Sequence, residues 1–231
     1  MSVESRILYE DNHLLAVNKE AGEIVQGDKT GDPSLGDTLK AFIKERDRKP
    51  GNVFLGVPHR LDRPVSGVAL FAKTGKALAR LNQMFRTREV EKKYWAITLQ
   101  KPEPQEAQLI HHLLRNEKLN KSFVSPHPKA ESKEAILNYR YLCSSDKYHL
   151  IEVELLTGRH HQIRAQLSAI GCTIKGDLKY GAPRSNPDAG ISLHARTLAF
   201  THPVSKVSLE IVAPLPDDAL WNYFNESMLR D

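Results

Sequence analysis

The sequence predicts an α+β fold: a single domain with a central, mostly antiparallel sheet and flanking helices. Two observations lead to this class. Short aliphatic and β-branched runs outnumber helical patterns, and the two kinds of segment do not alternate regularly as they do in parallel βαβ proteins. The chain has 231 residues, 40% of them hydrophobic and 26% charged, which is typical of a soluble globular protein. We therefore expect one domain over residues 1–231.

The first ninety residues are expected to form four strands and two helices. The strands are short aliphatic runs, expected at 6–19 (two strands around a turn at 10–12), 53–57 and 68–72. One helix begins near Ser34 and ends before Pro50, because its apolar residues recur at spacings of four and three. A second helix covers 75–86, with Thr74 as its N-cap.

The remainder of the chain is expected to add five strands and two helices. The strands are expected at 91–99, 134–142, 147–156, 192–200 and 206–212. The helices are expected at 160–170, which Gly171 ends, and at 218–229. Between them, the segment 101–130 contains the run QLIHHLL, which fits either a strand or a helix.

Bulk composition narrows the partners and the compartment. The net charge is +5, so a polyanion such as RNA is a reasonable partner. No apolar run approaches the roughly 20 residues of a membrane span, and residues 1–10 lack a signal-peptide pattern. We therefore expect a cytoplasmic protein with no membrane partner, in which Cys143 and Cys172 are reduced thiols. A monomer without an obligatory protein partner is the default expectation.

The loop PHRLDRPVSG, residues 58–67, is the first candidate site. It places one carboxylate, Asp62, between Arg60 and Arg63. An acid among arginines stays ionised at neutral pH, and an ionised carboxylate is what nucleophilic attack or proton abstraction requires. The structural alternative is a surface turn in which two solvated arginines flank an aspartate.

The segment TGRHHQIR, residues 157–164, is the second candidate. We expect Thr157-Gly158 to open a helix, whose backbone N–H groups would favour an anion. Arg159 and Arg164 add two guanidinium groups, and Arg164 follows the apolar Ile163 at the edge of the buried face. A guanidinium there can be partly buried and paired with a carboxylate. The alternative is an amphipathic helix with solvated arginines.

The strand at 91–99 supplies the third candidate, Tyr94. With period-2 alternation, Lys92 and Tyr94 face one side of the sheet, and Lys93 and Trp95 face the other. A tyrosine in a cleft can stack on a base, although a strand tyrosine is more often a packing residue.

Metal and nucleotide chemistry lack sequence support. The adjacent pairs His111-His112 and His160-His161 are expected to point apart, because neighbours do so on a strand or a helix. No HExxH, paired CxxC, GxGxxG or GxxxxGK[ST] motif is present. We therefore expect no metal site and no organic cofactor.

Four blocks of the sequence together resemble the RluA family of pseudouridine synthases. HRLDRPVSG followed by VALFAK resembles the family's first signature, and EKKYWAI resembles its tyrosine motif. LLTGRHHQIRAQLSAIG with IKGDLKYG resembles the third, and LHARTLAFTHP matches a fourth stretch. The resemblance spans about residues 7–212 in the family's order. The chain departs from the family at Val65 and His160, where threonine is usual.

The resemblance implies a role for each candidate. Asp62 would be the catalytic aspartate and the only acidic side chain in the motif loops, Tyr94 would stack beneath the target base, and Arg164 would pair with Asp62. The fold would be a single catalytic domain with a cleft across the sheet, without the separate N-terminal RNA-binding module that many relatives carry. RNA would be bound by basic and polar groups around the cleft, expected at Arg60, Arg63, Lys73, Arg159 and Gln162, with Lys175 or Lys179.

Some alternatives stay open at this stage. Asp62 could attack C1′ or C6 as a nucleophile, or remove a proton from C2′. The RNA could be tRNA, large-subunit rRNA or both. A different class of function is an RNA-binding or RNA-folding protein of the same fold without catalysis. A hydrolase acting on a small phosphorylated substrate would need a second carboxylate or a metal, and neither is placed for it.

Overall fold

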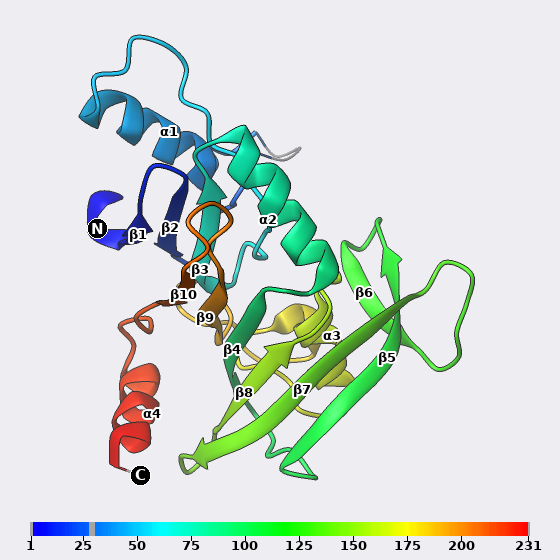
Figure 1. Cartoon of the computed structure of the whole chain (residues 1–231). Helices are drawn as coiled ribbons and strands as arrows, with labels where there is room; N and C mark the ends of the chain where they lie inside the picture. The colour runs from blue at the N-terminus through cyan, green and yellow to red at the C-terminus, as the bar shows by residue number, and fades with distance from the viewer. Residues whose placement is uncertain (1, 28–30, 231) are drawn as a thin grey trace. The chain divides into compact units, whose positions relative to one another are not determined.

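The computed structural model describes residues 2–27 and 31–230 (Figure 1). The chain divides into two compact units. Unit 1 comprises residues 1–90 and 195–214, and unit 2 comprises residues 91–194 and 215–231. Each unit combines strands with two helices. The predicted α+β class is thereby confirmed, whereas the description as one catalytic domain stays a prediction.

Unit 1 is built on strands paired in the order β1-β2-β3-β9, with β10 beside β9. The pairs β1–β2, β2–β3 and β9–β10 are antiparallel. Strand β9 begins at Leu193, two residues before the second stretch of unit 1, which begins at Ala195. The elements are β1 (Ile7–Glu10), β2 (Leu14–Lys19), α1 (Leu35–Arg46), β3 (Ser66–Ala72), α2 (Gly75–Thr87), β9 (Leu193–Thr201) and β10 (Ser208–Val212), with a 3-10 turn at Glu4–Arg6.

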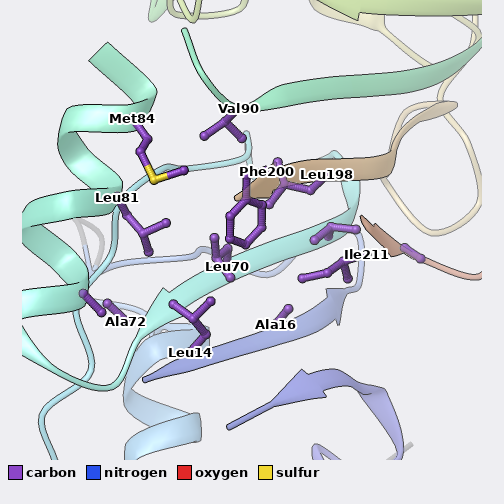
Figure 2. Packing of buried hydrophobic residues seen from close by; sticks show 13 residues of the cluster. Leu14, Ala16, Leu70, Ala72, Leu81, Met84, Val90, Leu198, Phe200 and Ile211 are labelled. Carbon is purple, nitrogen blue, oxygen red and sulfur yellow. The ribbon is translucent and has the colours of Figure 1, made fainter. Parts of the chain in front are cut away.

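The core of unit 1 forms where helix α2 packs on the sheet (Figure 2). The hydroxyl of Thr74 accepts the N–H of Ala77 and caps the helix, as predicted. Leu81 and Met84 of the helix point toward Leu70 of β3 and Phe200 of β9 (Figure 2). This one-sided packing fixes the start of β3, into which the loop at 58–67 leads.

The strand predicted at 53–57 is wrong. Only Gly56 pairs with the sheet, through a single bridge to Ala72 at the end of β3, and Phe54 is 50% exposed. The reason is that β3 already has β2 and β9 as neighbours, so little of its backbone is available to a further strand.

Unit 2 is built on an antiparallel sheet in the order β4-β8-β7-β5-β6. The ambiguous run QLIHHLL lies within β5. The elements are β4 (Glu91–Thr98), β5 (Glu106–Asn116), β6 (Lys121–Ser125), β7 (Lys133–Ser144), β8 (His149–Leu155), α3 (Gln162–Ala169), a 3-10 turn (Leu178–Tyr180) and α4 (Ala219–Arg230).

Two helices cover opposite faces of this sheet. Trp221 and Phe224 of α4 pack on Ile97 and Leu150, which are paired on one face. On the other face, Ala165 of α3 packs in a cluster with strands β5 and β7. In the described part of the chain, none of the helices has the length and apolar character needed to cross a membrane.

Candidate active site

The loop at 58–67 in unit 1 presents Asp62 between two buried anchors. Leu61 and Val65 are buried, whereas Asp62 is half-buried and Arg60 is exposed. The Val65 N–H donates to the Asp62 carbonyl at 3.0 Å and closes a tight turn. The loop therefore holds its carboxylate at a defined place while leaving it partly open to solvent.

A fully buried lysine at the end of β2 holds the same loop from beneath. The ammonium of Lys19 donates to the carbonyls of Glu20 at 3.0 Å, Arg63 at 3.0 Å and Val65 at 2.6 Å. Burial lowers the pKa of Lys19 to about 8, although the negative charges of Glu23 and Asp62 oppose the shift. The sequence shows Lys19 only as the last residue of an aliphatic strand, and its role was missed.

Gly67 ends the loop where no side chain fits. Its φ of +113° is in the range that favours glycine. A Cβ atom at this position would lie 2.2 Å from the carbonyl oxygen of Ala195, in the neighbouring strand β9. This close approach of two backbones fixes the start of β3, and with it the path of the loop.

Two of the predicted RNA-binding cations already have partners within unit 1. The guanidinium of Arg63 donates to Asp32 at 2.8 Å and to the Gly22 carbonyl at 3.0 Å. The ammonium of Lys73 donates to Glu10 and to the Asp11 carbonyl, both at 2.7 Å. Both side chains therefore brace unit 1, and any contact of theirs with RNA stays a prediction.

Arg164 in unit 2 is buried and ion-paired, as its place at the edge of the apolar face predicted. Its Nε and Nη2 donate to the two carboxylate oxygens of Asp177 at 2.7 and 2.8 Å. The two side chains are 5% and 1% exposed. The expectation that Asp62 is the only acid in the motif loops is wrong, because Asp177 lies in the run IKGDLKYG. The pairing of Arg164 with Asp62, a residue of the other unit, stays a prediction.

The helix of the second candidate segment, residues 157–164, begins at Gln162, and not at Thr157-Gly158 as predicted. Gln162 is 3% exposed. Its side-chain oxygen accepts the Thr157 hydroxyl at 2.7 Å and the Arg159 N–H at 3.0 Å. The amide therefore helps to fold the segment, and any contact of Gln162 with RNA stays a prediction. Arg159 is exposed and donates through Nε to the Glu134 carbonyl.

The two adjacent histidines before this helix do not point apart. The rings of His160 and His161 stack, with centroids 3.8 Å apart. The expectation failed because His161 has a left-handed backbone, with φ of 53°, and so belongs to neither a strand nor a helix. Burial, followed by the charge of Arg164, lowers the pKa of His161 to about 2, so this ring is neutral at physiological pH.

Tyr94 of β4 is buried on the face of the sheet that carries α3. It pairs in register with Val153, and its neighbour Trp95 packs in the α4 cluster on the opposite face. The alternation predicted for this strand is confirmed. Over residues 2–27 and 31–230, no group of three or more His, Cys, Asp or Glu side chains is arranged to hold a metal ion.

These features define a class of protein: an α+β enzyme that carries an aspartate loop, a strand tyrosine and a buried helix arginine. Comparison with known proteins identifies the family. The family model for RNA pseudouridylate synthase matches residues 13–169. The chain belongs to this family of RNA pseudouridine synthases, which are isomerases, and the resemblance to the RluA family is confirmed.

Curated relatives agree with this assignment. The chain is 35% identical to an uncharacterized RNA pseudouridine synthase of Chlorobaculum parvum, over 92% of this chain and 71% of that protein. It is also 35% identical to ribosomal large subunit pseudouridine synthase C of Vibrio cholerae, over 92% of this chain and 66% of that protein. The chain thus spans about two thirds of the length of these relatives.

Solved structures give the same fold. Human RNA pseudouridylate synthase domain containing 4 matches with a TM-score of 0.81 and 28% identity, over 99% of this chain and 93% of that one. Human RNA pseudouridylate synthase domain containing 1 matches with a TM-score of 0.72 and 24% identity, over 100% and 97%, which bears on the fold alone.

Proposed function

We propose that this protein converts specific uridines in large-subunit rRNA, tRNA or both to pseudouridine, with Asp62 as the catalytic aspartate. The observation that carries the proposal is the loop at 58–67, in which a half-buried carboxylate stands between buried anchors on a backbone held by Lys19. The names of several relatives, such as ribosomal large subunit pseudouridine synthase C, favour rRNA among these substrates.

The reaction explains why an ionised carboxylate is needed. The bond from N1 of uracil to C1′ of ribose breaks, the base turns and C5 bonds to C1′. The proton on C5 then leaves and N1 takes up a proton, so that the product is an isomer of the substrate. A base inside a helix must first be flipped out, which costs a few kcal/mol. Asp62 then acts either on C1′ or C6 as a nucleophile or on the C2′ proton as a base, and each route requires the charged form.

The other candidate residues divide the remaining tasks. Tyr94 stacks beneath the flipped uracil, and Arg164 orients the carboxylate of Asp62. Arg60 is exposed on the loop and enters the helical stack that the base leaves, while Arg159 contacts phosphates. The segments 23–52 and 101–130, which contain α1 and strands β5 and β6, select the RNA.

The wider setting follows from the same chemistry. Isomerisation neither oxidises nor transfers a group to a second substrate, so we propose that the protein acts without a metal or an organic cofactor. Two cysteines in a chain of this length do not make a disulfide framework, which suits a reducing compartment such as the cytoplasm. A monomer and a single catalytic domain complete the proposal.

The test is release of tritium from RNA labelled at uracil C5. Asp62→Asn and Asp62→Ala should lose roughly 10⁴-fold or more of the rate, while RNA binding measured by gel shift is retained. Glu89→Gln is the matched control, because it neutralises an exposed carboxylate of unit 1 that accepts the Thr87 hydroxyl at the end of α2. Near-normal turnover by either Asp62 variant would rule out the assignment.

The same assay separates the enzyme from a silent RNA-binding protein. Binding of RNA by the unaltered chain, without tritium release from tRNA or rRNA, would favour the silent alternative. Mapping pseudouridines in total RNA from cells that lack the gene then identifies the substrate, because the lost positions belong to this enzyme.

A further inference from the structure

The segment GDLKYG, residues 176–181, follows α3 and contacts the guanidinium of Arg164 through the side chains of Asp177 and Tyr180. Gly176 has φ of +86°, and a Cβ atom there would lie 2.7 Å from the side chain of Asn186. The Tyr180 N–H donates to the Asp177 carbonyl at 3.0 Å, so one tight turn joins the two residues. Both side chains of this turn reach the same guanidinium.

Asp177 fixes the guanidinium in its plane. A two-point pair through Nε and Nη2 prevents rotation about the last bonds of the arginine side chain, which a single hydrogen bond would allow. The pair is almost wholly buried, so water does not weaken it.

Tyr180 fixes the guanidinium from its face. The carbon at the centre of the Arg164 guanidinium lies 5.1 Å from the centre of the Tyr180 ring, within cation–π range. The Tyr180 hydroxyl accepts the Ser122 N–H at 2.9 Å and donates to the Ser122 carbonyl at 3.0 Å. His161 lies 3.1 Å from the same hydroxyl. The ring is therefore tied to strand β6 and cannot move away from the arginine.

We propose that Asp177 and Tyr180 are positioning residues of the isomerisation, which hold the guanidinium of Arg164 in the orientation that the reaction needs. Neither residue touches the substrate; both act through Arg164. The inference rests on the proposed function, in which Asp62 and Arg164 work together. A misplacement of about 1 Å in a catalytic group can cost about 10²-fold in rate, so the hold on Arg164 has a measurable effect.

A double-mutant cycle tests this role. Asp177→Asn keeps the shape and removes the charge; we expect kcat to fall about 10²-fold with KM within about twofold, corrected for the folded fraction. In an Arg164→Met background the same change should cause no further loss of kcat, because its route of action is gone. A purely structural role would lower kcat in both backgrounds.

Tyr180→Phe repeats the cycle without disturbing the buried ion pair, in case Asp177→Asn does not fold. It retains the ring and releases its anchor, so we expect kcat to fall about tenfold, again only when Arg164 is present. Glu152→Gln and Tyr223→Phe are the matched controls. They neutralise a carboxylate and remove a tyrosine hydroxyl at the partly exposed Arg140–Glu152 ion pair and at an exposed tyrosine of unit 2.

The outcomes separate the inference from the function on which it rests. Equal losses in both backgrounds, unchanged kcat in both foldable variants, or a kinetically silent Arg164→Met would overturn the positioning role. Absence of tritium release by the unaltered chain would instead overturn the proposed function. Loss of kcat confined to chains that retain Arg164 would support both.

Discussion

The loop that carries Asp62 and the site that carries Arg164 hold their charged groups in opposite ways. In unit 1, the buried cation of Lys19 binds main-chain carbonyls of the loop, so the contacts fix the backbone. In unit 2, the cation of Arg164 is itself held, by the carboxylate of Asp177 and the ring of Tyr180. The contacts of Lys19 fix the backbone of a loop, whereas the contacts of Asp177 and Tyr180 orient a single side chain.

The difference predicts where each site is vulnerable. The stability of a site that is fixed through its backbone should change little when an exposed side chain such as Arg60 is replaced. It should fall when a substitution alters the path of the backbone. A site fixed through side chains responds to the loss of single polar atoms, because buried partners are left unpaired. The following predictions test this contrast, first in the loop and then in the arginine site.

Gly67→Ala should have the largest effect, because it alters the chain path directly. The new Cβ would overlap the backbone of Ala195 and strain a φ of +113°. We expect unfolding free energy to fall by about 3–5 kcal/mol, measured by urea denaturation. Gly75→Ala is the control, since its Cβ would meet nothing within 4 Å at the start of α2. A loss below about 1 kcal/mol for Gly67→Ala would contradict the backbone-fixed loop.

Most of the fold could be predicted from local patterns. The starts of α1 and α2 were predictable from Ser34 and Thr74, whose hydroxyls cap the N-terminal ends of the helices. The strand at 53–57 could not, because an aliphatic run becomes a strand only if a neighbouring strand has free backbone groups. Its neighbour β3 already pairs with β2 and β9. That pairing depends on the whole sheet and cannot be read from the sequence of residues 53–57.

The candidate site was predictable to the extent that its chemistry is local. Asp62 stood out because two arginines flank it, and the burial of Arg164 followed from helical spacing. Lys19 and Asp177 were missed because each acts on a residue elsewhere in the chain: Lys19 and Arg63 are 44 positions apart, and Arg164 and Asp177 are 13 apart. The stacking of His160 on His161 depends on the left-handed backbone of His161, which no sequence pattern predicted.

Lys19→Met should have the second largest effect. The methionine fills the same space but leaves the carbonyls of Glu20, Arg63 and Val65 without their donor. Relief from burying a charge offsets part of this loss, so we expect a net destabilisation of about 2–4 kcal/mol at pH 7. Urea denaturation measures it, and a neutral or stabilised variant would show that the ammonium does not hold the loop.

The pH dependence of this variant sharpens the test. Folded Lys19 loses its proton at about pH 8, whereas in the unfolded chain it does so near the usual 10.5. Between these values the unfolded state binds more protons, so Lys19 adds stability as pH rises. The destabilisation caused by Lys19→Met should therefore be about 1.4 kcal/mol larger at pH 9 than at pH 7. An equal effect at both pH values would argue against a depressed pKa.

The arginine site should respond to acid instead, with the smallest effect of the three. His161 stays neutral in the folded protein because burial and Arg164 lower its pKa to about 2, from the usual 6.5. Below pH 6.5, His161 takes up a proton in the unfolded chain but not in the folded protein. Stability is therefore lost as pH falls, by about 2 kcal/mol between pH 7 and pH 5 from this residue alone.

His161→Asn isolates that contribution, because asparagine tolerates the left-handed backbone at this position. The variant should lose about 2 kcal/mol less than the unaltered protein between pH 7 and pH 5, measured by urea denaturation at both pH values. His127→Asn, at an exposed histidine, should leave the difference unchanged. Equal acid sensitivity of His161→Asn and the unaltered protein would mean that His161 accepts a proton in the fold, and that the arginine site is more open to water than its buried ion pair implies.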